Sequence, residues 1–130
     1  MKDMDTAITI RLPLPPRELS PNARVHWGRR HRHSKAYRTT ARVAAMEGTM
    51  DTALGVDWSH SEVKTTFYHR DKRKRDGDNL IAMMKSAYDG IADFLNVDDV
   101  GWIHVRIERL IDRNDPRVEV TLTKVAEEGK

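Results

Sequence analysis

The chain has 130 residues, no cysteine, and a formal net charge of +3. This length fits a single domain that spans residues 1–130, and the missing cysteine excludes disulfides, thiolate zinc sites and cysteine nucleophiles. The first residues are polar and no apolar run approaches the ~20 residues of a membrane span, so we expect a cytoplasmic protein without a membrane partner.

The N-terminal third predicts a strand, a basic loop and a helix. Residues 6–12 alternate apolar and polar side chains, as a half-buried strand does, and prolines 13, 15 and 16 end it. Residues 17–33 show no period and are expected to form a loop. Ser34 is the expected N-cap of a helix that ends near Gly48 or Gly55, with Ala36, Thr40, Val43, Ala44 and Met46 as its apolar stripe.

Positive charge is concentrated in this region. No acidic residue lies between Glu18 and Glu47, and the cations there include Arg29, Arg30, Arg32, Lys35 and Arg38. Such an uneven distribution is an electrostatic footprint for a polyanion. Trp27 lies among these cations and can either stack on a base or anchor the loop.

The remaining elements follow in order. Residues 61–69 predict a second strand, and residues 79–90 a second helix with Leu80, Met84, Ala87 and Ile91 on its buried face. Residues 103–107 and 118–122 alternate as strands, and Asn114-Asp115-Pro116 between them predicts a hairpin. The order β-α-β-α-β-β predicts an α+β fold, a small mixed sheet with two packed helices.

One stretch carries the chemistry, Asp71-Lys72-Arg73-Lys74-Arg75-Asp76-Gly77-Asp78-Asn79-Leu80. Carboxylates are the usual protein ligands of Mg²⁺, and Lys and Arg are the usual partners of phosphate. In extended backbone Asp76 and Asp78 point the same way and can share a metal, beside the free amides of the helix that follows. The alternatives are turn chemistry, an N-cap at Asp78 and a solvated basic face.

A second acidic pair, Asp98 and Asp99, follows about twenty residues later. A helix over residues 79–90 would end roughly 18 Å from Asp78. Residues 91–98 would then have to return along it, at about 3.3 Å per residue, for Asp99 to reach the same metal. Otherwise the third carboxylate comes from a partner subunit, or the pair is only a loop.

The chain resembles the RusA family of Holliday junction resolvases. The resemblance rests on the basic run, Asp76-Gly77-Asp78-Asn79-Leu80, Lys85-Ser86-Ala87-Tyr88-Asp89-Gly90-Ile91, Asp98-Asp99-Val100 and the N-terminal strand with its prolines. It implies a homodimeric, Mg²⁺-dependent endonuclease of bacteria or their phages that cuts four-way DNA junctions, with Mn²⁺ as a substitute. It also implies three essential aspartates, which are Asp76, Asp78 and Asp99 here.

Other roles follow from that resemblance. Asp98 would assist as a metal ligand, and Lys85 would join the catalytic residues. Phosphate contacts are expected from Lys72, Arg73, Lys74 and Arg75, besides the N-terminal cations. One position departs from the family pattern, because Ala82 replaces a frequent lysine. The alternative is therefore a nucleic-acid binding protein with weak or no catalysis.

Overall fold

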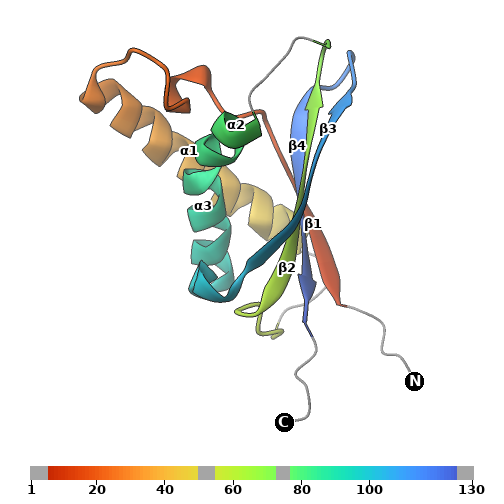
Figure 1. Cartoon of the computed structure of the whole chain (residues 1–130). Helices are drawn as coiled ribbons and strands as arrows, with labels where there is room; N and C mark the ends of the chain where they lie inside the picture. Colours follow the sequence, from red (N-terminus) through yellow and green to blue (C-terminus); the bar gives the residue numbers. More distant parts are fainter. Residues whose placement is uncertain (1–5, 50–54, 73–76, 126–130) are drawn as a thin grey trace.

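The computed structural model describes residues 6–49, 55–72 and 77–125, apart from the side chain of Asp78. Four strands form one sheet and the helices lie on one of its faces (Figure 1). The strands are β1 (Ala7–Leu12), β2 (Ser61–His69), β3 (Ile103–Ile111) and β4 (Arg117–Lys124). The helices are α1 (Trp27–Gly48), α2 (Gly77–Met83) and α3 (Lys85–Leu95), with short 3-10 turns η1 (Arg17–Leu19) and η2 (Asp99–Gly101). The predicted α+β class is confirmed.

The sheet order is β1-β4-β2-β3. β4 pairs antiparallel with both β1 and β2, whereas β3 runs parallel to β2. The predicted hairpin of the last two strands is therefore wrong, because they lie on opposite sides of β2. The connection crosses the end of β2, where the Asp112 amide donates to the carbonyl oxygen of His69 at 2.8 Å. The turn residues were recognised correctly, but local turn chemistry does not say which strand becomes the neighbour.

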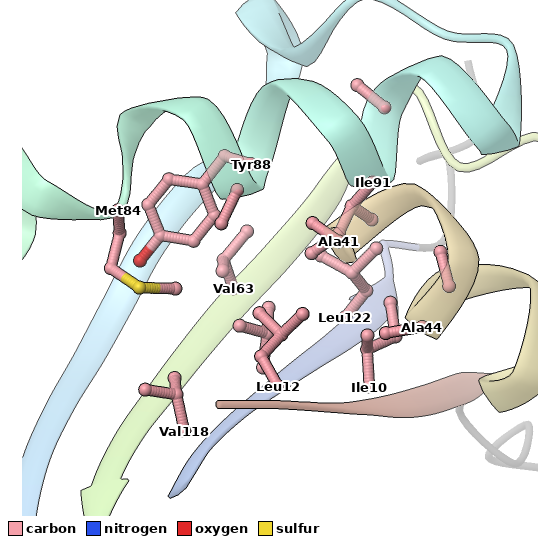
Figure 2. Packing of buried hydrophobic residues seen from close by; sticks show 14 of the residues in the cluster. Ile10, Leu12, Ala41, Ala44, Val63, Met84, Tyr88, Ile91, Val118 and Leu122 are labelled. Carbon is pink, nitrogen blue, oxygen red and sulfur yellow. The ribbon is translucent and has the colours of Figure 1, made fainter. Parts of the chain in front are cut away.

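The core fills the space between the sheet and the helices, as Figure 2 shows. β1 and β4 bury alternate residues, with Ile10 and Val120 fully enclosed. The predicted stripe of the second helical region is confirmed, since Leu80, Met84 and Ala87 are buried together with Ile91. This packing fixes α3 against the sheet and so positions everything that follows α3.

The first helix begins earlier than predicted. It starts at Trp27, where the His26 Nδ1 atom accepts a hydrogen bond from the Gly28 amide at 3.0 Å, and Ser34 lies inside it. The Arg30 guanidinium donates to the carbonyl oxygens of Ser20 and Ala23, both at 2.9 Å, and so holds the preceding loop against the helix. A histidine cap and arginines that bind backbone resemble a basic loop in sequence, which explains the error.

The buried face of α1 also differs from the predicted stripe. Of that stripe Ala44 is buried, while Ala36, Thr40, Val43 and Met46 are exposed. The face that packs consists of Tyr37, Ala41, Ala44 and Ala45. The small side chains on this face of α1 let α3 approach closely. The helices are so close that a Cβ atom added to Gly90 would lie 2.1 Å from the Arg38 carbonyl oxygen.

The second helical region is two helices. α2 ends at Met83, and α3 continues past the predicted end at Gly90 to Leu95. Asn96 then adopts a left-handed conformation with φ 59°, which ends α3 and reverses the chain. Gly90 stays helical because its missing side chain makes room for α1. None of the described helices has the length and apolar character that a membrane crossing needs.

Candidate active site and nucleic-acid interface

Asp98 and Asp99 border a hollow on the helical side of the molecule, which we call the acidic hollow. Its volume is about 440 Å³, and it lies between α1, α3 and the segment that returns from α3 to β3. The lining residues are Arg38, Asp89, Ala92, Asp93, Asn96, Val97, Asp98 and Asp99. The fold thus gathers four carboxylates and one guanidinium around one space.

The two adjacent aspartates play different local roles. The Oδ1 atom of Asp98 accepts a hydrogen bond from the Val100 amide at 3.0 Å, which makes Asp98 the N-cap of η2. Asp99 is the first residue of η2, and its charge acts on two neighbours, since it helps to raise the pKa of Lys85 and opposes the lowering of the pKa of His104. Asp99 is therefore the member of the pair with an electrostatic role.

Lys85 binds Asp89, one of the residues that line the acidic hollow. Its Nζ atom is 3.1 Å from the Asp89 Oδ1 atom, and this hydrogen bond, more than the charges of Asp89 and Asp99, raises the pKa of Lys85. The ammonium group stays charged at neutral pH. A fixed positive charge next to carboxylates is suited to holding a phosphate oxygen near them.

Arg38 binds an acid of its own chain. Its Nε and Nη2 atoms donate to the two carboxylate oxygens of Asp93 at 2.7 and 2.9 Å, and Asp89 lies 3.9 Å from its Nη1 atom. The hydrogen bond to Arg38 lowers the pKa of Asp93, and the same pairing raises the pKa of Arg38. A bidentate pair of this kind joins α1 to α3, so Arg38 is first of all a structural cation.

Within the described residues, no three acidic or histidine side chains converge as a metal site. Asp76 lies outside those residues, and so do Arg73, Lys74 and Arg75. The backbone of Asp78 belongs to α2, but its side chain is not described. The predicted ligand set of Asp76, Asp78 and Asp99 therefore stays a prediction.

The fold does fix the path between these acids. β2 and β3 are parallel, so Asp98 and Asp99, which precede β3, lie at the end of the sheet where β2 begins. The stretch with Asp76 follows the opposite end of β2. α2 and α3 lead back, but Asp89, which shares the acidic hollow with Asp99, comes eleven residues after Asp78 and belongs to the second of these two helices. Because α3 runs to Leu95, the return segment is shorter than the eight residues that the sequence suggested.

The predicted DNA-binding cations separate into two groups. Arg30 binds backbone, as described above, and the Arg29 Nη2 atom lies 3.3 Å from the Glu18 Oε2 atom. Arg32 and Lys35 are exposed on the side of α1 opposite its buried stripe, and they pair with no acid in the described part of the chain. Lys72 is exposed as well. Arg32, Lys35 and Lys72 are thus the cations best placed to meet a polyanion.

Trp27 is the clearest surface feature that the sequence left open. It is 76% exposed at the start of α1, and its ring stacks on that of His26 with 5.6 Å between centroids. Trp58 and Trp102 are buried, and the Trp102 indole donates to the Trp58 carbonyl oxygen at 2.8 Å. Trp27 is therefore no anchor of a loop, and its aromatic face lies open next to the basic side of α1.

Sequence reasoning missed Asp89 and Asp93. Both were hidden in an ordinary helical pattern, although Asp89 stands four residues after Lys85, the spacing at which opposite charges meet on a helix. Asp93 carried no such signal, because its partner Arg38 comes from another helix. The distinction between a capping Asp98 and an unpaired Asp99 was equally absent from the sequence pattern.

Comparison with known proteins yields a relative that matches over most of this chain. No protein-family model matches the chain. A protein of Xylella fastidiosa (strain Temecula1 / ATCC 700964), described as uncharacterized, is 36% identical over 123 residues, which cover 93% of this chain and 79% of the relative. The chain belongs to the same family as this Xylella protein.

Proposed function

We propose that this protein is a Mg²⁺-dependent endonuclease that cuts four-way DNA junctions, as its resemblance to the RusA family implies. The observation that carries the proposal is the order of charged segments on the fold. Strand β2 leads into the cationic and acidic stretch, and α2 begins within that stretch, at Gly77. Lys85, at the start of the next helix, is close enough to Asp99 for the charge of Asp99 to raise its pKa. The exposed cations of α1 add a surface for phosphates.

The donor chemistry suits a hard cation. Asp76, Asp78 and Asp99 offer carboxylate oxygens, and the chain has no cysteine that would favour a softer metal. Asp98 could contribute only the oxygen that does not cap η2. Bound Mg²⁺, or Mn²⁺ in its place, would supply a nucleophile at neutral pH and balance the charge that develops on the phosphate.

The chain's own residues do the positioning. Lys85 would hold a non-bridging phosphate oxygen beside Asp99, with Asp89 keeping the ammonium group in place. Lys72, Arg32 and Lys35 would bind phosphates along the arms of the junction, assisted by the basic run that begins at Lys72. Trp27 would stack on a base exposed where the strands exchange. We further propose that the protein acts as a homodimer in the cytoplasm of a bacterial or phage-infected cell.

A nucleic-acid binding protein without cleavage is the second candidate. Ala82, which replaces a lysine frequent in the RusA family, is exposed on α2. The residues one turn before it on the helix include no cation that could replace this lysine. The separation of Asp89 and Asp99 from Asp78 along the chain also favours this candidate. Binding would then use the same cations without a complete set of metal ligands.

Cleavage of a labelled four-way junction separates the two candidates. The nuclease proposal expects cleavage with Mg²⁺ or Mn²⁺ and none in EDTA, while Ca²⁺ supports binding but little cleavage because its geometry is looser. A linear duplex of the same sequence is the control for junction preference. Binding without cleavage in every metal would favour the second candidate, and strong cleavage in EDTA would contradict the role of the metal.

A further inference from the structure

Strand β3 presents an unusual amount of apolar surface. Of the ten large apolar side chains that are exposed in the described residues, five belong to β3: Ile103, Val105, Ile107, Leu110 and Ile111, each between 44% and 60% exposed. A strand with such an alternating pattern commonly buries one of its faces. In the structure every residue of β3 is exposed or half-buried, so the strand buries neither face.

The outer edge of β3 is also open. β3 pairs with β2 on one side, and no described strand pairs with its other side. At the opposite edge strand α1 comes close to β1, where a Cβ atom added to Gly48 would lie 2.9 Å from the Thr9 carbonyl oxygen. An open edge strand is a template for strand pairing, and five of the nine residues of β3 are apolar and exposed.

We propose that β3 pairs antiparallel with β3 of a second copy, around a two-fold axis centred on Ile107. The two sheets would then join into one sheet with the helices of both copies on the same face. This inference names the surface of the proposed homodimer, but it rests on the exposed edge and not on nuclease activity.

The charges of β3 select this register. In a symmetric antiparallel pair, residues opposite each other share a face of the sheet, so one residue must face itself. Centring on Ile107 sets Arg106 opposite Glu108 of the partner subunit, twice. Centring on Arg106, Glu108 or Arg109 instead sets two like charges opposite each other, and centring on Leu110 sets Glu108 against an aspartate. The Ile107 register alone gives opposite charges and an apolar centre.

The contacts within one chain agree with this arrangement. Arg106 and Glu108 lie on the same face, with 2.8 Å between their charged groups, and Lys64 lies 3.5 Å from Glu108. The pairing register of β2 and β3 shifts between Val63 and Lys64, and beyond this bulge Ile107 pairs with the buried Thr65. Ile107 therefore lies on the face of the sheet that carries the helices. The second copy would therefore bury Ile107 near the end of the helical layer and leave the charged pairs on the open face.

The two-fold axis has a consequence for the acidic hollow. Ile111 pairs with His69, so the end of the partner's β2 would come two strand spacings, about 10 Å, from the start of β3. Asp98 and Asp99 precede that start. The end of the partner's β2, which the cationic and acidic stretch follows in the sequence, would thus lie at the same end of the joined sheet as Asp99, whereas within one chain the end of β2 and the start of β3 are at opposite ends.

Charge reversal tests the interface without DNA. Arg106→Glu and Glu108→Arg each set like charges opposite each other at two symmetric positions and should raise the dimer dissociation constant at least about tenfold. An equimolar mixture of these two variants restores both opposite-charge pairs and should dimerise. Sedimentation velocity over a concentration series measures all three samples, and circular dichroism confirms that each variant is folded.

Two further variants complete the test. Ile107→Lys places a charge at the centre of the edge and should yield monomers, whereas Val43→Lys, an equally exposed position on α1, should leave the dimer intact. A wild-type chain that stays monomeric at every concentration would overturn the proposal. So would a dimer that is indifferent to the β3 variants, or two monomeric charge variants that fail to associate when mixed.

Discussion

Gly90→Ala tests the contact between α1 and α3 that forms the acidic hollow. The new Cβ atom would lie 2.1 Å from the Arg38 carbonyl oxygen and 3.0 Å from the Ala41 Cβ atom. The first distance is more than 1 Å shorter than an ordinary carbon–oxygen contact. The obstructing atom belongs to the backbone, so relief requires α1 and α3 to separate and not a side chain to rotate.

Two opposing contributions determine whether Gly90→Ala lowers or raises the free energy of unfolding. Overpacking of this kind costs about 1–3 kcal/mol, while replacing glycine by alanine inside a helix contributes about 1 kcal/mol in the opposite direction. Because the obstructing atom belongs to the backbone, we take the upper part of that cost, about 2–3 kcal/mol, and expect a net loss of about 1–2 kcal/mol in the free energy of unfolding. For a domain of this size that corresponds to a fall of roughly 5 °C in melting temperature.

Urea denaturation and calorimetry measure this loss. Ala36→Gly on the exposed side of α1 is the matched control, since it changes helix propensity alone and should cost about 1 kcal/mol. A more stable Gly90→Ala protein would show that propensity dominates and that the two helices are not in close contact. The position of Arg38 beside Asp93 would then need another explanation.

Three further predictions concern charge, stacking and pH. Arg32→Ala and Lys35→Ala should each lower the slope of log K against log salt for DNA binding by about one, whereas Arg38→Ala should reduce stability and leave the slope unchanged; equal slopes in all variants would mean that α1 does not bind phosphate. DNA should quench tryptophan emission in the wild type and much less in Trp27→Phe, because the other two tryptophans are buried, and undiminished quenching would exclude stacking by Trp27. The His104 ring, 4.7 Å from that of Tyr88, is partly desolvated, and this lowers its pKa below the ordinary value of 6.5, so the stability that its neutral form contributes is complete above that pH and lost as the pH falls. His104→Gln should therefore flatten the fall in unfolding free energy between pH 7 and pH 5, and an unaltered fall would contradict this origin.

The sequence predicted those elements whose apolar period matches their burial. β2 was predicted with its observed bounds, and the stripe of Leu80, Met84, Ala87 and Ile91 is buried as expected. In these segments a one-sided environment imposes the period that the residues display, so local pattern and tertiary structure agree.

The errors occurred where partners distant in the sequence decide the structure. α1 buries alanines beneath a glycine of α3, so its apolar period is weak and its cationic start resembles a loop. β3 has the alternation of a half-buried strand, but its place at the sheet edge leaves that pattern exposed. The site shows the same limit, because the pairing of Arg38 with Asp93 depends on a helix contact that no local pattern encodes.

The most direct test of the proposed nuclease measures junction cleavage and junction binding together in Asp99→Asn, with Asp98→Asn beside it. Asparagine caps a helix as well as aspartate does, so Asp98→Asn should keep the fold of η2 and most of the activity. In Asp99→Asn the amide is a poor ligand for a hard cation, and one negative charge near DNA is removed. We predict that Asp99→Asn binds the junction at least as tightly as the wild type but no longer cuts it in Mg²⁺, and that Asp76→Asn and Asp78→Asn behave in the same way. Cleavage by Asp99→Asn at the wild-type rate would contradict the central role of this carboxylate.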